Sequence, residues 1–227
     1  MQEFTEPELV SPPTTGNLSD HLLDSERLAP NQPAIALPSG GGWTDLTYQE
    51  FADDVRAVAK GVAASGVQVG DRVGIMSRTR YEWTLVDYAL WYAGAVPVPI
   101  YETSSAEQVE WILGDSGAVG VFLESDKHKE VFDQVSGALP AVTRPWVFDD
   151  GAIDDLRAAG TDIDDEELEN RRSSVTPDSV ATIIYTSGTT GRPKGCTLTH
   201  SNFMFEVDAV IAGAPEVFAP GQSTLLF

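Results

Sequence analysis

The sequence predicts an α/β fold in which a mostly parallel sheet is flanked by helices. Short apolar stretches alternate with stretches of helical periodicity between residues 72 and 148, a pattern typical of βαβ units. Two capping boxes, Thr47–Glu50 and Ser105–Gln108, mark helix starts within the same pattern. We expect the α/β subdomain to span residues 18–186. An extended arm at 1–17 would precede it, and the start of a further subdomain at 187–227 would follow.

The elements before the sheet are expected to be an arm, a short helix, a hairpin and a longer helix. Prolines at 7, 12 and 13 oppose regular structure in the arm. The segment 18–28 has the character of a short helix, and 34–48 reads as a hairpin with a glycine turn. After Thr47, apolar residues recur at helical spacing up to Gly66, a residue suited to a left-handed helix end.

The sheet itself is predicted from four apolar stretches separated by helical segments. Such strands are short and apolar because helices cover both faces of a parallel sheet. The predicted strands are 72–76, 96–99, 118–123 and 145–148, and the predicted helices are 81–93, 105–113 and 127–139.

The segment 149–170 is strongly acidic. It predicts a solvated helix-and-loop insertion on the surface. The alternative is a metal-binding or partner-binding segment, although its carboxylates lack the glycine-anchored spacing of a calcium loop. A run rich in β-branched residues at 179–186 then predicts a buried strand.

Composition narrows the classes of function. The net charge of −21 disfavours nucleic-acid and anionic-lipid binding, and any nucleotide site needs a local cluster of positive charge. The single cysteine, Cys196, permits no intrachain disulfide and fits a reducing, cytoplasmic setting. The N-terminal residues do not resemble a signal peptide, and the apolar stretch 88–101 is too short for a membrane span. Peripheral membrane contact and a homodimer stay open.

The segment from Thr186 to Gly195 carries the chemistry. Glycines allow successive backbone N–H groups to converge on one point, and hydroxyls add donors there. Lys194 brings a full positive charge, with Arg192 close by. This combination predicts a cradle for the phosphates of ATP. The candidate ligands are Thr186, Ser187, Gly188, Thr189, Thr190, Gly191 and Lys194.

The segment differs from a Walker A loop, because Pro193 precedes the lysine and Gly195 follows it. Residues 196–199 have strand character, so the loop is expected to join two strands. A helix should begin later, capped by Thr199 or Ser201.

Residues 185–195 resemble the phosphate-binding signature of the adenylate-forming (AMP-binding) enzymes, a superfamily that includes acyl-CoA synthetases. Further landmarks are LTYQEF at 46–51, the VGDRV run at 69–73 and Glu82-Trp83. The segment 94–105, with its Pro-Ile-Tyr-Glu-Thr run, is similar to the long-chain fatty acyl-CoA synthetase branch.

The resemblance implies a ligase that uses ATP, Mg²⁺ and CoA. A long-chain fatty acid would become an acyl-adenylate and then an acyl-CoA. The loop would hold the β- and γ-phosphates, and Thr190 would be the one Mg²⁺ ligand in this segment. Catalytic residues are expected beyond residue 227, so the resemblance implies that this chain is an N-terminal part, inactive by itself.

Two alternatives stay open. One is another carboxylate-activating member of the superfamily, a fatty acyl-AMP ligase or an adenylation domain. The other is a non-catalytic binding module. Among single residues, His200 is expected to cap or pack rather than to bind substrate, and Cys196 to be an inert core thiol. The tryptophans at 83, 91 and 111 are expected in the core.

Overall fold

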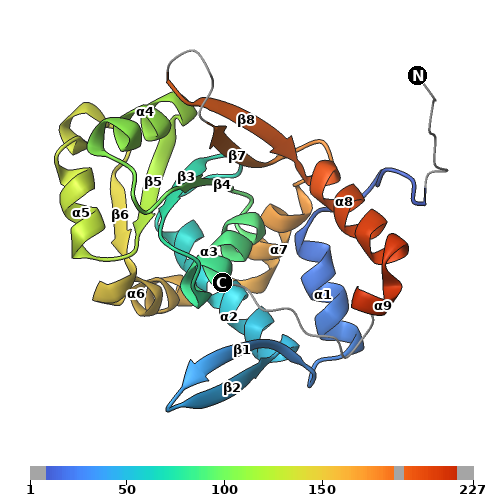
Figure 1. The fold of residues 1–227 in the computed structure, drawn as a ribbon. Helices are drawn as coiled ribbons and strands as arrows, with labels where there is room; N and C mark the ends of the chain where they lie inside the picture. Colours follow the sequence, from blue (N-terminus) through green and yellow to red (C-terminus); the bar gives the residue numbers. More distant parts are fainter. Residues whose placement is uncertain (1–8, 187–191, 219–227) are drawn as a thin grey trace, which may run out of the picture.

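The computed structural model describes residues 9–186 and 192–218 of the chain (Figure 1). Short 3-10 helices at Ser136–Ala138, Phe148–Asp150 and Gly160–Asp162 supplement the main elements. These elements are α1 (Ser19–Leu28), β1 (Pro33–Ser39), β2 (Gly42–Thr47), α2 (Tyr48–Ala64), β3 (Arg72–Met76), α3 (Tyr81–Tyr92), β4 (Val96–Ile100), α4 (Ala106–Ser116), β5 (Ala118–Leu123), α5 (Asp126–Asp133), β6 (Arg144–Val147), α6 (Ala152–Ala159), α7 (Asp165–Ser173), β7 (Val180–Thr186), β8 (Lys194–Thr199), α8 (His200–Gly213) and α9 (Pro215–Phe218).

The centre of the molecule is a four-stranded parallel sheet in the order β4-β3-β5-β6. Strand β3 pairs in parallel with β4 on one side and with β5 on the other. The α/β class and the four predicted strands are confirmed, each strand within one residue at either end. The prediction succeeds because strands buried on both faces must be apolar along their whole length.

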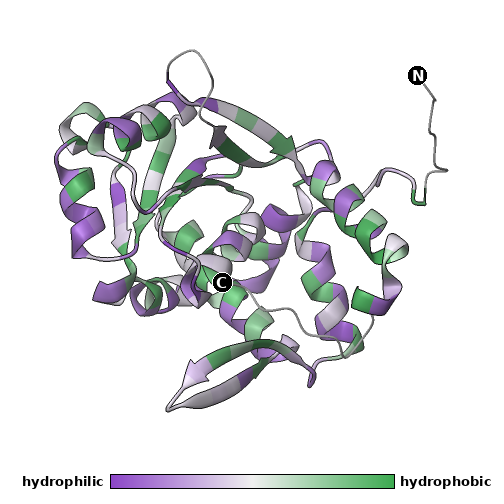
Figure 2. Cartoon of the chain, viewed as in Figure 1, coloured by the Kyte–Doolittle hydropathy of each residue, from purple (hydrophilic) through white to green (hydrophobic). Residues whose placement is uncertain are grey.

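Helices cover both faces of this sheet. Helices α2 and α3 pack on one face, in a cluster that includes Val73 and Ile75 of β3. Helices α4 and α5 pack on the other face, around Met76, Val121 and Leu123. Hydrophobic residues follow β5 in Figure 2, whereas much of α5 is hydrophilic. Because helices cover both faces, other elements can pack only against the edge strands, β4 and β6.

Both predicted capping boxes are present at the starts of α2 and α4. Thr47 and Glu50 exchange hydrogen bonds at the first helix, and Ser105 and Gln108 do so at the second. Gly61 in α2 serves a different purpose. A Cβ atom built on it would lie 2.1 Å from the carbonyl oxygen of Leu156, so only glycine lets α2 approach α6 this closely.

Strand β7 does not join the parallel sheet. It pairs antiparallel with β8, from Val180 opposite Thr199 to Thr186 opposite Lys194. It lies against β4, the edge strand, where the Thr182 hydroxyl donates to the Pro97 carbonyl at 2.9 Å. The backbone groups of residues 97 and 99 point away from β3, and proline has no N–H to offer a new strand. The prolines therefore stop the parallel sheet at β4.

The acidic segment 149–170 folds as surface helices α6 and α7 joined by a 3-10 turn. Within the part of the chain that the structure describes, no three His, Cys, Asp or Glu side chains gather as metal ligands would. None of the helices in the described ranges combines the length and the apolar character that a bilayer crossing needs. The subdomain boundaries at 17 and 186 stay predictions.

Candidate nucleotide-binding site

The β7–β8 hairpin holds the two ends of the predicted phosphate loop side by side. Thr186 closes β7 and Lys194 opens β8, and the two residues are paired in the strand register. Both side chains are exposed. The expectation that the loop joins two strands is confirmed. Ser187, Gly188, Thr189, Thr190 and Gly191 lie outside the described residues, and the assignment of Mg²⁺ to Thr190 falls among them.

The described ends of the loop carry two cations. None of the ion pairs among the described residues involves Arg192 or Lys194, whereas most other basic side chains of the chain pair with carboxylates. Arg192 and Lys194 are both exposed. A chain with a net charge of −21 thus leaves two positive charges for an anion at the place where the sequence predicts phosphate binding.

Helix α4 contacts both limbs of the hairpin. The hydroxyl of Tyr185 donates to Asp115 at 2.7 Å, and the indole N–H of Trp111 donates to the Pro193 carbonyl at 2.8 Å. The Arg192 guanidinium lies over the Trp111 ring, 4.8 Å from its centre. Trp111 was expected in the core. The structure confirms that it packs against the core cluster, but its N–H and one ring face also serve the hairpin.

Two sequence signals could have revealed this role. Trp111 and Asp115 are four residues apart and so share one face of a helix. A half-buried indole N–H also needs a hydrogen-bond acceptor. Neither signal identifies the partner strand, because the partners lie 70 and 82 residues away in sequence.

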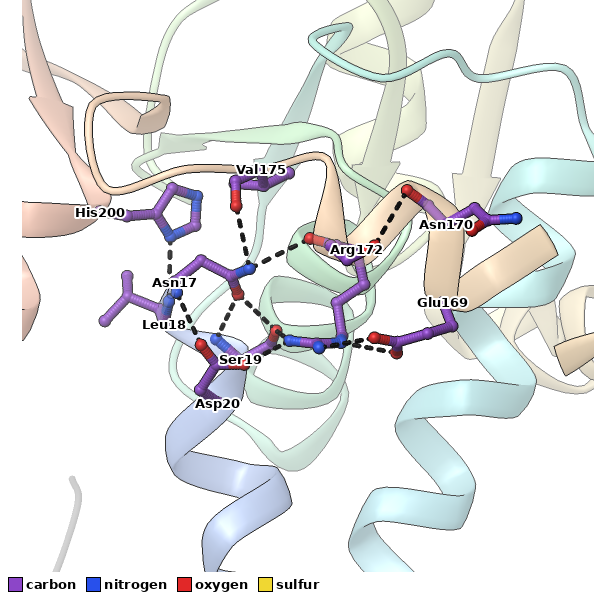
Figure 3. A network of polar contacts seen from close by, with 10 residues as sticks. Asn17, Leu18, Ser19, Asp20, Glu169, Asn170, Arg172, Val175 and His200 are labelled. Carbon is purple, nitrogen blue, oxygen red and sulfur yellow. Dashed lines mark hydrogen bonds and ion pairs between the residues drawn. The ribbon is translucent and has the colours of Figure 1, made fainter. Parts of the chain in front are cut away.

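His200 follows the end of β8 opposite Lys194 and lies in a polar network with the start of α1, as Figure 3 shows. Its ring is 1% exposed, and Nδ1 accepts a hydrogen bond from the Leu18 backbone N–H at 3.2 Å. Burial lowers the pKa of His200 to about 4, so the ring is neutral at physiological pH. The prediction that His200 packs rather than binds substrate agrees with this geometry.

The same network ties the start of α1 to α7. Buried Asn17 donates through its amide to the carbonyls of Arg172 and Val175. Arg172 in turn forms ion pairs with Asp20 and with Glu169, the latter at 2.7 Å. The bonds that Asn17, Leu18 and Asp20 form in this network reach residues more than 150 positions away, so they fix the beginning of the described chain to its later part (Figure 3).

The prediction that Cys196 is a core thiol is wrong. The thiol was expected in the core, but it is exposed. The prediction assumed that a strand after the loop would be buried on both faces. Strand β8 instead belongs to a two-stranded sheet, and its residues from Lys194 to Thr197 are exposed among the described residues.

Comparisons with known proteins bear on this site. A family profile described as "AMP-binding enzyme" matches residues 24–226. The long-chain-fatty-acid–CoA ligase FadD15 of Mycobacterium bovis, like that of Mycobacterium tuberculosis, is 42% identical over all of this chain, which spans 38% of the length of those relatives. The crystal structure of a long-chain-fatty-acid-CoA ligase, FadD1 from Archaeoglobus fulgidus, superposes with a TM-score of 0.71 at 26% identity, covering 92% of this chain and 40% of that one.

Proposed function

The chain belongs to the AMP-binding enzyme family. On that premise we propose that it forms part of a long-chain fatty acid–CoA ligase. In the first step the fatty acid carboxylate attacks the α-phosphorus of ATP. The bond to the β-phosphate oxygen breaks, which gives the acyl-adenylate and pyrophosphate. In the second step the CoA thiol attacks the acyl carbon, and AMP leaves.

One observation carries the proposal for this chain: the hairpin pairs Thr186 with Lys194 at the mouth of the glycine-rich segment. The pairing brings a hydroxyl and a cation together beside the backbone that would cradle phosphate. Phosphoryl and acyl transfer of this kind depends on positioning and charge neutralisation. Similarity over the whole chain to ligases named for long-chain fatty acids supports that substrate class.

Each predicted ligand has a role in this scheme. Lys194 would neutralise charge on the β- and γ-phosphates as they become pyrophosphate. The backbone and hydroxyls of residues 186–191 would donate hydrogen bonds to the same oxygens. Mg²⁺ would neutralise further phosphate charge, with Thr190 as its ligand from this segment. No catalytic acid or base is assigned to this chain.

The reaction is proposed to run in the cytoplasm, where the acidic composition and the lone cysteine fit. Peripheral membrane contact and a homodimer are both compatible with the proposal. Neither is required by the chemistry at the hairpin.

Product analysis of the complete protein tests the proposal. The protein is incubated with palmitate, ATP and Mg²⁺, with and without CoA, and the products are identified by mass spectrometry. We expect palmitoyl-AMP and pyrophosphate without CoA, and palmitoyl-CoA and AMP with it. Acyl-adenylate that never becomes thioester would indicate a fatty acyl-AMP ligase. Failure to consume or bind ATP would leave the non-catalytic module.

A further inference from the structure

Helix α4 contacts the chain on both sides of the predicted phosphate-binding residues, at Tyr185 and at Pro193, and the two contacts differ in kind. On the β7 limb, Asp115 accepts from the Tyr185 hydroxyl at 2.7 Å. On the β8 limb, the Trp111 indole donates to the carbonyl of Pro193 at 2.8 Å. Pro193 immediately precedes Lys194, so this second bond orients the peptide unit from which the lysine extends.

We infer that α4 orients the two described flanks of the predicted phosphate-binding segment, Tyr185 and Pro193, with Trp111 and Asp115 as positioning residues for ATP. The inference rests on the proposed function, because it presumes that the loop binds the phosphates. Neither residue is required to touch ATP. Each acts through a residue of the hairpin that flanks the loop.

The hairpin needs such support because it has only two strands. Isolated two-stranded hairpins are marginally stable, and β4 offers β7 no backbone donors at Pro97 and Pro99. Groups that bind charge in a reaction contribute most when they are ordered before the substrate arrives. Contacts from a rigid helix to both limbs supply that order.

The residues of α4 that bond to the hairpin are less buried than the core residues of the helix. Val109, Ile112 and Leu113 are buried in the cluster beneath the sheet, whereas Asp115 is exposed and Trp111, which also packs against the cluster, is half-buried. Asp115→Ala therefore leaves the core packing of α4 in place, and Trp111→Phe keeps an aromatic ring against the cluster. The core residues of the helix explain its stability, but they do not explain why Trp111 and Asp115 bond to strands 70 and 82 residues away.

The Tyr185 side is shaped by the residue opposite it. Tyr185 pairs with Gly195, and a Cβ atom built on Gly195 would lie 3.1 Å from Cζ of the tyrosine ring. The missing side chain thus leaves room for the ring to reach Asp115. Burial and the Asp115 carboxylate raise the pKa of Tyr185, so its hydroxyl stays protonated and continues to donate at physiological pH.

The Trp111 side also controls a cation. The Arg192 guanidinium lies 4.8 Å from the centre of the Trp111 ring, within the range of a cation–π interaction. An exposed arginine in so acidic a chain would otherwise be drawn towards surface carboxylates. The ring keeps this charge beside the loop, next to Lys194.

Three substitutions in the complete protein separate the contacts. Trp111→Phe keeps an aromatic ring and removes the indole donor. Asp115→Ala removes the acceptor for Tyr185, and Asp115→Asn restores an acceptor without the charge. Trp83→Phe is the matched control, a half-buried tryptophan of α3 that packs against the core on the other face of the sheet. The measurements are palmitate-dependent ATP–pyrophosphate exchange and thermal unfolding.

We expect Trp111→Phe and Asp115→Ala to raise the KM for ATP about 3- to 10-fold, the effect of losing one hydrogen bond. The KM for palmitate and the Tm should stay near the wild-type values. Asp115→Asn should recover most of the loss, and Trp83→Phe should behave as wild type. Equal rises in both KM values together with a fall in Tm would show a merely structural role and overturn the inference.

Lys194→Ala in the same assay distinguishes failure of the positioning role of α4 from failure of the phosphate-binding role of the loop. If Lys194→Ala impairs exchange while the α4 variants keep wild-type KM for ATP, the positioning role is refuted and the phosphate role of the loop stands. If Lys194→Ala also exchanges pyrophosphate at the wild-type rate, the proposed function of the loop fails.

Discussion

The parallel sheet and the β7–β8–α8 region differ in the interactions that hold their residues in place. Val73 and Ile75 of the sheet are 0% exposed, whereas Ile184 of β7 is 37% exposed and Ile211 of α8 is 45% exposed. Burial on both faces leaves the sheet little freedom of sequence. The second region buries fewer residues, among them Ala181 and Met204, and is also held by polar contacts to α4 and to the start of α1. Stability is thus concentrated in one region and the predicted ligand groups in the other.

Removal of a core ring should have the largest effect. Phe122 is fully buried and stacks on Trp146, with 4.6 Å between the ring centres. We expect Phe122→Ala to lower the free energy of unfolding by about 3–5 kcal/mol, the usual cost of emptying such a site. Ile211→Ala on α8 is the matched control and should cost less than about 1 kcal/mol. Urea titrations would measure both, and equal losses would remove the contrast between the two regions.

Loss of the loop cation should affect activity and spare stability. Lys194 is exposed and stands at the start of β8. In the complete protein, we expect Lys194→Ala to slow ATP–pyrophosphate exchange by about 10- to 1,000-fold, since it removes one charged stabiliser of the leaving pyrophosphate. The Tm should not change measurably. Lys127→Ala, an exposed lysine of α5, is the control and should exchange normally. A large loss of Tm in Lys194→Ala would place the lysine among the structural residues instead.

His200 joins the two regions and should give the network a pH dependence. Burial lowers its folded-state pKa to about 4, below the unfolded value of about 6.5. Between these values the unfolded state binds more protons, so stability is fully present above about pH 6.5 and decreases as pH falls towards 4. The share from His200 should be about 1–3 kcal/mol.

The difference between the wild type and His200→Gln isolates this share from the carboxylates that titrate in the same range. Chemical denaturation at several pH values would give the two curves. We expect them to converge as the pH is lowered from 6.5 to 4. A constant offset between the curves would mean that His200 binds protons equally in the folded and unfolded states, so that burial does not lower its pKa.

The smallest effect should come from Cys196. Its thiol is exposed on β8. We expect Cys196→Ser to change the free energy of unfolding by less than about 0.5 kcal/mol. The native wild-type thiol should react with iodoacetamide as fast as it does in urea. Protection of the thiol in the native protein would restore the original core assignment and show that β8 is covered in solution.

Sequence analysis predicted the buried elements best. Strands 72–76 and 118–123 were placed to the residue, and the capping boxes at Thr47 and Ser105 gave the helix starts. Apolar runs and caps are local signals, which is why they can be read from a single sequence. The packing of β7 could not be predicted in this way. It depends on the direction in which Pro97 and Pro99 of β4 face, and that is not a local signal.

The sequence predicted the phosphate-binding segment of the candidate site, but not the residues from elsewhere in the chain that contact it. The loop between two strands followed from glycines and from the strand character of 196–199. The anchoring of that loop on Trp111 and Asp115 did not, because it depends on the path of the hairpin over α4. Cys196 was misplaced for a related reason: strand propensity does not tell whether a strand will be covered.

The network around Asn17 and His200 has a consequence for synthesis of the chain. The residues that hold the start of α1 leave the ribosome well before their partners at 172 and 200 are made. At about 5–20 residues per second, the interval between Asn17 and Arg172 is roughly 8 to 30 seconds. Throughout that time the Asn17 amide has neither of its native carbonyl partners. The parallel sheet is complete once residue 147 has been made, so the nascent core can assemble first and the N-terminal helix can lock onto it only at the end.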